Sequence, residues 1–330
     1  MLQTTKANQA NESFALKKLH GIKPKGVKAK LACSNFELLV DCYDFFIDYS
    51  SDTFKIKSNA TIFDDLHKFK SKNYGLIKQK LENVLFTKNN LEEFILAKSN
   101  QDYLEFERAV VAVYSGILID LLTERNKSED KSTSFYFNGN GNRFDLLFFG
   151  AKNIGELIVD NFIGEGICLS VGADNGKVNL VAAINCHPEY GLFGFAGMDK
   201  GEINTLIAVG CSGKNTFINS NIRGGKTKNL VFLNNDFDFE GQYRNDVTGI
   251  PSKIEHAENF YYSNACISSN VSDIVEFSIG SDNYRNRKWI DANMPQLNEL
   301  ANVVANGSEQ NKIIAVRKIQ YLINGVNNYN

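Results

Sequence analysis

The amino-acid sequence predicts an α/β fold, and three observations lead to that expectation. Residues 101–126 carry apolar side chains at helical spacing. Short apolar runs separated by Gly and Asn clusters come next, which is typical of strands and turns. Residues 286–304 and 309–323 return to helical spacing. Because helical and strand-like segments alternate along the chain, we expect helices packed on a sheet.

Composition limits the classes of protein that this chain can belong to. With 330 residues, 43% hydrophobic and 22% charged, it can form one large domain or two ordinary ones. A net charge of −2 predicts no general affinity for nucleic acid. The six Cys are scattered, so we expect free thiols and a cytoplasmic location. No apolar run has the length of a signal peptide core or a membrane span, so we expect no membrane partner.

Residues 1–30 form a basic segment. Seven of them are Lys and only Glu12 is acidic. Charge blocks of this kind are usually solvated, so the sequence predicts a flexible arm. The alternative is that the arm binds an anionic partner.

The first half of the remaining chain, residues 31–190, is expected to form the α/β core. Residues 36–50 are a buried run, and residues 52–58 alternate like a strand. Residues 60–86, 101–126 and 153–166 predict helices. The runs "ICLSVGA" and "VNLVAAINC" predict strands.

The second half, residues 191–330, is expected to be a strand-rich C-terminal region closed by helices. Its apolar runs "TLIAVG", "TFINS", "NLVFLN" and "DFDFEGQY" lie between Gly and Asn clusters. The two helical segments at 286–304 and 309–323 would close the fold. No internal repeat is evident in the sequence.

The stretch "SFYFNGNGNRFDLLFF" has two interpretations. Asn-Gly between apolar runs is a strong signal for a hairpin, because both residues tolerate positive φ. The same residues, Asn138, Gly139, Asn140, Gly141 and Asn142, could instead leave the backbone open, so that successive N–H groups bind an anion. In the second interpretation, the next residue, Arg143, adds a fixed positive charge or stacks on a flat ring.

The segments "VAVYSGILIDLLTERN" and "TSFYFNGNGNRFDLLFFG" together resemble the second half of an actin-like ATPase. In that superfamily, a buried helix with small residues precedes a strand that ends in a Gly-containing turn beside the nucleotide. Some bacterial members write this turn G-N-G, as Gly139–Gly141 do here. The resemblance continues to residue 188, with Lys177 in the place of the family's loop Lys and Gly176 in place of its Pro.

The resemblance implies an actin-like (ribonuclease-H-like) core and an ATP-binding protein, with Mg²⁺ as a companion ion. The nucleotide would lie against residues 138–143, with Lys177 as a further contact. The family's first phosphate loop is not present: Asp41 and Asp48 follow apolar residues but no Gly-Thr comes after them. The resemblance therefore implies a degenerate, catalytically weak member that acts through self-assembly or a partner chain. The alternative function is a non-enzymatic interaction or structural protein with Asn/Gly-rich binding loops.

Another stretch carries a weaker signal. Gly210, Gly213, Lys214 and Thr216 resemble a phosphate loop, although the spacing is two residues short and Asn215 follows the Lys. A plain β-turn is the competing interpretation, and a phosphate-handling enzyme would be a third function.

Chemistry at the remaining polar residues is not favoured by their spacing. Cys186 and His187 are adjacent, so on a strand they point to opposite faces and do not pair easily. Asp236, Asp238 and Glu240 share one strand face, which could hold a hard cation but is more typical of a solvated face.

Overall fold

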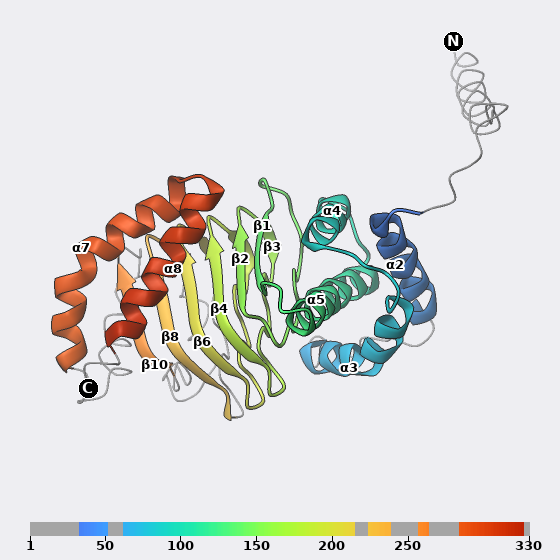
Figure 1. Ribbon diagram of the computed structural model, residues 1–330, viewed down its shortest axis with the longest axis horizontal. Coiled ribbons are helices and arrows are strands. Elements are labelled where there is room, and N and C mark those ends of the chain that lie inside the picture. The colour runs from blue at the N-terminus through green and yellow to red at the C-terminus, as the bar shows by residue number, and fades with distance from the viewer. Residues whose placement is uncertain (1–32, 52–61, 215–223, 239–256, 264–283, 327–330) are drawn as a thin grey trace, which may run out of the picture. The chain divides into compact units, whose positions relative to one another are not determined.

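The computed structural model describes residues 33–51, 62–214, 224–238, 257–263 and 284–326 (Figure 1). The chain divides into a unit Met1–Ser34 and a unit Asn35–Asn330, and every element described below belongs to the second. The predicted basic arm at residues 1–30 lies outside the described residues.

A parallel β-solenoid of about four turns forms the centre of the structure (Figure 1). Its main sheet has six strands that pair in chain order, all parallel. They are β1 (Ser134–Asn138), β2 (Glu156–Asp160), β4 (Lys177–Ile184), β6 (Glu202–Val209), β8 (Lys226–Leu233) and β10 (Ala257–Ser263). We call one turn of the solenoid a coil, and the first coil begins with β1. Each coil places its main-sheet strand beside the strand of the coil before it.

The strand register reveals a structural repeat that the sequence analysis did not find. Glu156 pairs with Leu180, Leu180 with Thr205, and Thr205 with Asn229, so equivalent positions lie 24, 25 and 24 residues apart. The expectation of no internal repeat is therefore wrong. One sequence signal does recur at the ends of β2, β4, β6 and β8, where the corner residues have positive φ: Asn161, Asn185, Gly210 and Asn234. Asn and Gly are the residues that adopt this conformation most readily.

A short strand starts the second side of the coils that follow β2, β4, β6 and β8, and overlapping β-turns form this side between residues 145–150, 167–175 and 192–200. The short strands are β3 (Ile163–Glu165), β5 (His187–Tyr190), β7 (Ser212–Lys214) and β9 (Asp236–Asp238), paired as β3–β5 and β7–β9. In the first coil, Phe149 N–H donates to Leu146 O and Ala151 N–H donates to Phe148 O. Phe148 and Gly150 have positive φ at the third position of these turns, as a type II turn requires.

Both faces of the main sheet are buried. Leu157, Val159 and Val181 point into the solenoid, whereas Ile158 and Ala182 belong to a second apolar cluster on the outer face. Two helices, α7 (Tyr284–Asn306) and α8 (Glu309–Val326), cover this outer face (Figure 1) with the apolar side chains Leu297, Ala301, Val304, Ala315, Val316, Ile319 and Ile323. Burial on both faces explains why these strands are nearly continuous apolar runs.

Four helices precede the first coil and share its core: α2 (Asn35–Ser51), α3 (Ile62–Lys80), α4 (Lys88–Lys98) and α5 (Glu105–Ser128). Gly116 in α5 lies so close to the coil that an added Cβ would be 2.0 Å from Phe149 O. A side chain at this position would push the helix away from the solenoid.

The predicted actin-like (ribonuclease-H-like) core is wrong, because the described residues form a mixed α/β structure with six helices and a parallel solenoid. The loop 138–142 does not join a hairpin either, since β1 pairs in parallel with β2. Parallel strands need a long connection, here one whole coil. The main sheet also runs across residue 190, because β4 pairs directly with β6.

Some of the helices and strands predicted from the sequence are confirmed, and others are wrong. Helices at 60–86, 101–126, 286–304 and 309–323 are confirmed by α3, α5, α7 and α8. The helix predicted at 153–166 is wrong, because this segment forms β2 and β3. "ICLSVGA" forms turns, whereas "VNLVAAINC", "TLIAVG" and "NLVFLN" contain β4, β6 and β8. The strands predicted at 52–58 and in "TFINS" lie outside the described residues.

Candidate binding groove

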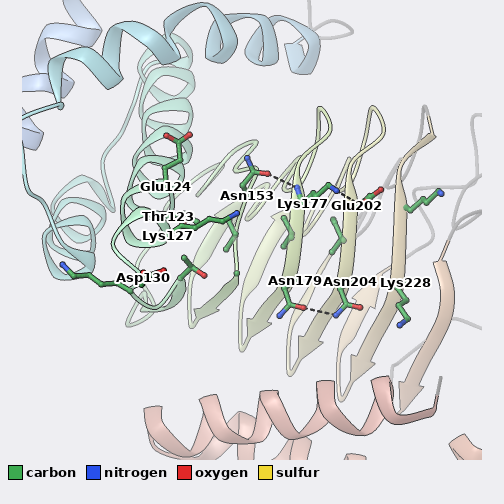
Figure 2. Close-up of a pocket in the computed structure, with 17 residues that line it drawn as sticks. Thr123, Glu124, Lys127, Asp130, Asn153, Lys177, Asn179, Glu202, Asn204 and Lys228 are labelled. Atoms are coloured by element: carbon green, nitrogen blue, oxygen red, sulfur yellow. Dashed lines mark hydrogen bonds and ion pairs between the residues drawn. The ribbon is translucent and has the colours of Figure 1, made fainter. Parts of the chain in front are cut away.

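A groove runs along the amino ends of the solenoid strands, beside the C-terminal end of α5 (Figure 2). Its volume is about 1030 Å³, which is at the upper limit of ordinary small-molecule pockets. Seventeen residues line it: Thr123, Glu124, Lys127, Asp130, Lys131, Thr133, Asn153, Ile154, Gly155, Lys177, Val178, Asn179, Glu202, Ile203, Asn204, Lys226 and Lys228.

Stacking of the coils places polar residues of successive strands side by side in the groove. Lys177 is in register with Glu202, and Glu202 is in register with Lys226. Two residues further along β4 and β6, the Asn204 side-chain amide donates to Asn179 Oδ1 over 3.0 Å (Figure 2). The groove therefore presents two rows of polar side chains that run along the solenoid axis.

Positive charge is in excess in the groove. Its lining contains five Lys and three acidic residues. Lys177 Nζ lies 3.5 Å from Glu202. Glu124 forms an ion pair with Lys78, which is not one of the residues that line the groove. Lys127 and Lys226 are exposed and have no side-chain partner among the described residues. These two ammonium groups, on α5 and on β8, are available to an anionic ligand.

A smaller cavity of about 190 Å³ shares Glu124 and Asn153 with the groove. It contains Lys70, whose Nζ donates to Asp120 Oδ2 at 2.8 Å and to Gly150 O at 2.6 Å. A third contact reaches Gly116 O at 3.4 Å. Burial lowers the pKa of Lys70, and the charge of Asp120 opposes that shift. Because its three N–H groups have acceptors, Lys70 anchors α3 and α5 to the first coil.

Asp174 forms a second contact between α3 and the solenoid. Its Oδ2 lies 3.3 Å from His67 Nδ1 and 3.2 Å from Lys152 Nζ. The hydrogen bond with His67 is the main cause that holds the Asp174 pKa well below its ordinary range, and the charges of His67 and Lys152 add to it. His67 Nε2 is buried and has no hydrogen-bond partner among the described residues.

The predicted nucleotide loop packs against the next coil. Gly139 is buried, and an added Cβ would be 2.5 Å from the Phe162 ring and 2.6 Å from Asn161 O. Gly141 is exposed with no atom within 4 Å of the same position, and it does not line either cavity. The glycines at the ends of the G-N-G turn thus have different surroundings.

The main-chain N–H groups of this loop are bonded to protein acceptors. The N–H groups of Gly139 and Gly141 donate to carbonyls of the next coil. Asn142 N–H donates to Gly139 O, and Asn140 N–H donates to Asn138 Oδ1. An anion-binding site needs N–H groups that point at the ligand without another acceptor, so the predicted nest is not formed in this conformation.

The two side chains predicted to assist the nucleotide lie apart from each other. Arg143 pairs with Glu189 at 2.7 Å and with Asp145 at 3.1 Å, and these contacts raise its pKa. It follows the carboxyl end of β1, whereas Lys177 starts β4. Since the strands are parallel, the loop and Lys177 lie at opposite ends of the sheet. ATP binding by these residues stays a prediction that a titration must test.

The residues that resemble a phosphate loop lie at a corner of the solenoid and in β7, except for one that is not described. Gly210 is a corner residue, and Gly213 packs in β7 against Pro188, whose O would be 2.2 Å from an added Cβ. Lys214 ends β7, and Thr216 lies outside the described residues. Phosphate binding by this set is therefore not tested by the geometry.

The side chains of His187 and Ser212 form a pair that the sequence did not predict. His187 Nδ1 lies 2.9 Å from Ser212 Oγ, because β5 and β7 are neighbours in successive coils. A hydroxyl beside a base can act as a nucleophile when a third group orients the base. No described carboxylate bonds the other ring nitrogen of His187, and neither residue lines the groove or the cavity. We therefore interpret this contact as a hydrogen bond between coils.

The cysteines and acidic residues form no metal site within the described part of the chain. No group of three or more His, Cys, Asp or Glu there is placed to hold an ion. Cys186 and Cys211 are buried free thiols, and burial raises the pKa of the Cys211 thiol. Asp236 and Asp238 lie in β9, whereas Glu240 lies outside the described residues.

Comparisons with known proteins give no family for this chain. A scan against protein-family models, a search of curated proteins and a search of solved structures each found no match. Among the helices that the structure describes, none combines the length and apolar character needed to cross a bilayer. The function must therefore be argued from the groove itself.

The groove could have been found in the sequence only by aligning the coils. When "KVNLVAAIN", "EINTLIAVG" and "KTKNLVFLN" are placed beneath one another, their first residues are charged and their third residues are Asn, Asn and Lys. This signal is short and recurs only three times. It becomes informative once the register shows that these positions are neighbours.

Proposed function

We propose that this protein is a non-enzymatic binding protein whose ligand lies along the groove. The observation that carries the proposal is the alignment of polar side chains from β4, β6 and β8 with those of α5 in one continuous groove (Figure 2). Stacked coils commonly provide extended binding surfaces, because each coil adds one equivalent position.

The groove is well suited to bind an extended ligand without rearrangement. Its polar side chains project from paired strands, and rigid elements hold binding groups more accurately than loops do. The hydrogen bond between Asn204 and Asn179 and the contact between Lys177 and Glu202 orient these side chains in pairs. This preorganisation lowers the entropic cost of binding.

The test is a binding survey with a groove-blocking variant. Purified protein is titrated with linear polymers of four kinds: acidic polysaccharide, neutral polysaccharide, single-stranded RNA and acidic polypeptide. We expect at least one polymer to bind and to be recovered unchanged. We expect the Asn204→Trp variant, which fills the groove, to lose about tenfold or more in affinity, equivalent to about 1.4 kcal/mol.

The matched control is Asn302→Trp, at an exposed position of α7 outside the groove. It should bind like the unmodified protein, and both variants should keep the thermal unfolding midpoint. Equal binding by Asn204→Trp and unmodified protein for every polymer would refute the groove as the binding surface. Turnover of a bound polymer would refute the non-enzymatic role.

Nucleotide binding is tested in parallel with fluorescent ATP and Mg²⁺. The prediction from the sequence requires micromolar binding that Gly141→Leu abolishes. No atom lies within 4 Å of a Cβ added at Gly141, so a Leu side chain has room there. The positive φ of Gly141 adds backbone strain to the variant. No binding at millimolar nucleotide would leave the groove as the remaining site.

A further inference from the structure

Taking the groove as the binding surface of the proposed function, we propose that its ligand is a linear acidic polysaccharide. The inference rests on three properties of the lining: the spacing of its charges, the kinds of polar groups beside them, and the side chains that a different polymer would require.

The spacing of the groove suits a chain of sugar units. Neighbouring strands are about 4.8 Å apart, so the equivalent residues Lys177 and Lys226, two strands apart, start about 10 Å from each other along the solenoid axis. One pyranose unit in an extended chain is about as long as one strand spacing. Carboxylates on every second unit would therefore meet Lys226 and then Lys177, whose ammonium group also lies 3.5 Å from Glu202.

Groups that suit sugar hydroxyls lie between and beside the charges. Glu202 stands between the two lysines in the ladder, and its carboxylate can accept from hydroxyls. Asn153, Asn179 and Asn204 offer side-chain amides, which both donate and accept hydrogen bonds. At the α5 end, Asp130 can accept and Lys127 can bind a further carboxylate.

The lining does not suit nucleic acid or peptide as well. None of the seventeen described residues in it is aromatic or Arg, whereas proteins that bind single strands stack the bases on such side chains. Among these described residues, the apolar side chains larger than a methyl group are Ile154, Val178 and Ile203, each buried. Peptide partners usually need an apolar pocket for an anchoring side chain.

The experiment compares one polymer with and without its charge. Oligogalacturonate long enough to span the groove is titrated into the protein by calorimetry, and its fully methyl-esterified form is titrated beside it. We expect the acid form to bind at least about tenfold more tightly, because only it carries carboxylates for the lysines. Its affinity should fall as salt rises from 50 to 300 mM, by about tenfold, because salt screens exposed charges.

Two variants locate the charges. Lys127→Gln and Lys226→Gln should each weaken acid binding about threefold to tenfold and should weaken the binding of the ester by a smaller factor. Lys318→Gln, at an exposed position of α8 outside the groove, is the matched control and should bind like the unmodified protein. Far-ultraviolet circular dichroism confirms that each variant is folded.

The outcomes separate this inference from the proposed function. Equal affinity for acid and ester, or full acid binding in the Lys127→Gln/Lys226→Gln double variant, would overturn the acidic polysaccharide. Tighter binding of poly(U) or polyglutamate that Asn204→Trp abolishes would also overturn it, while the groove would remain a binding surface. If no polymer binds in a manner sensitive to Asn204→Trp, both proposals fail.

Discussion

Gly139 and Gly141 lie two positions apart, yet different physical requirements act on them. Gly139 has no room for a side chain because Phe162 and the Asn161 carbonyl of the next coil press against it. Gly141 has room, but its φ of +77° is one that side-chain-bearing residues rarely adopt. From the sequence, both glycines are expected to contact a nucleotide, whereas the structure connects Gly139 to the packing of one coil on the next.

We predict that the two glycines respond differently to alanine. Gly139→Ala should lower the free energy of unfolding by about 1–3 kcal/mol, because the methyl group overlaps rigid neighbours. Gly141→Ala should cost only about 1 kcal/mol, for its backbone conformation. Urea unfolding of both variants measures the difference. An equal or larger loss for Gly141→Ala would contradict the packing of this loop.

At the scale of elements, the two C-terminal helices are held to the sheet by charge as well as by apolar packing. The Lys312 ammonium group lies 2.6 Å from Asp160 Oδ2, and the Tyr136 hydroxyl donates to the same oxygen. Asp160 is fully buried, and its register partner in the next coil is the apolar Ile184. Arg317 reaches Glu156 at 2.8 Å, where the next coil has Leu180. Two carboxylates of β2 thus pair with basic residues of α8.

We predict that the contact between Lys312, Asp160 and Tyr136 stabilises the packing of α8 only when all three side chains are present. Lys312→Met should lower the free energy of unfolding by about 3–5 kcal/mol, because it leaves the Asp160 carboxylate buried without a cation. The triple variant Tyr136→Phe/Asp160→Ile/Lys312→Met should recover most of that loss, since it copies the apolar contact of the next coil.

Denaturant unfolding compares these variants with Lys318→Met, an exposed position on the same helix. That control should change stability by no more than about 0.5 kcal/mol. If Lys312→Met is as mild as the control, the buried pair does not hold the helix.

For the whole molecule, polar contacts join the N-terminal helices to the solenoid. Lys70 of α3 binds both Asp120 of α5 and the Gly150 carbonyl of the first coil. His67, also in α3, reaches Asp174 in the turns that follow β3. The apolar core continues across the same boundary, so the helices close the end of the solenoid core next to the first coil.

We predict that the His67–Asp174 contact is weakened by acid. Its partners hold the folded-state pKa of Asp174 below the ordinary 3.8, so the contact stabilises the fold above that value. The stabilisation is lost as pH falls from about 3.8 toward the lowered folded value, where the carboxylate takes up a proton.

Thermal unfolding from pH 7 to pH 2 tests this. Asp174→Asn should be less stable than the unmodified protein at pH 7, and the difference should shrink as pH falls below 4. Asp102→Asn, at an exposed position before α5, serves as the control. A difference between Asp174→Asn and the unmodified protein that does not change with pH would contradict the assignment.

Helices were more predictable from the sequence than the arrangement of strands was. The apolar spacing in residues 101–126 arises from one face of one helix, so it can be seen within α5 alone. Residues 153–166 misled the analysis, because "ELIVD" in a strand buried on both faces has no alternation to mark it. The predicted hairpin at 138–142 failed for a related reason: a Gly/Asn corner has the same local conformation whether the next strand returns or continues the coil.

By itself, the sequence determined the positions of most helices, the apolar character of the strands and the Asn/Gly corners, because each depends on residues close together in the chain. The tertiary structure alone decided the parallel stacking of the coils, the burial of Gly139 and the groove. These depend on partners about 24 residues apart, such as Lys177 and Glu202, whose pairing is set by backbone hydrogen bonds between coils. Local spacing contains no record of that register, so the groove became visible only in the folded chain.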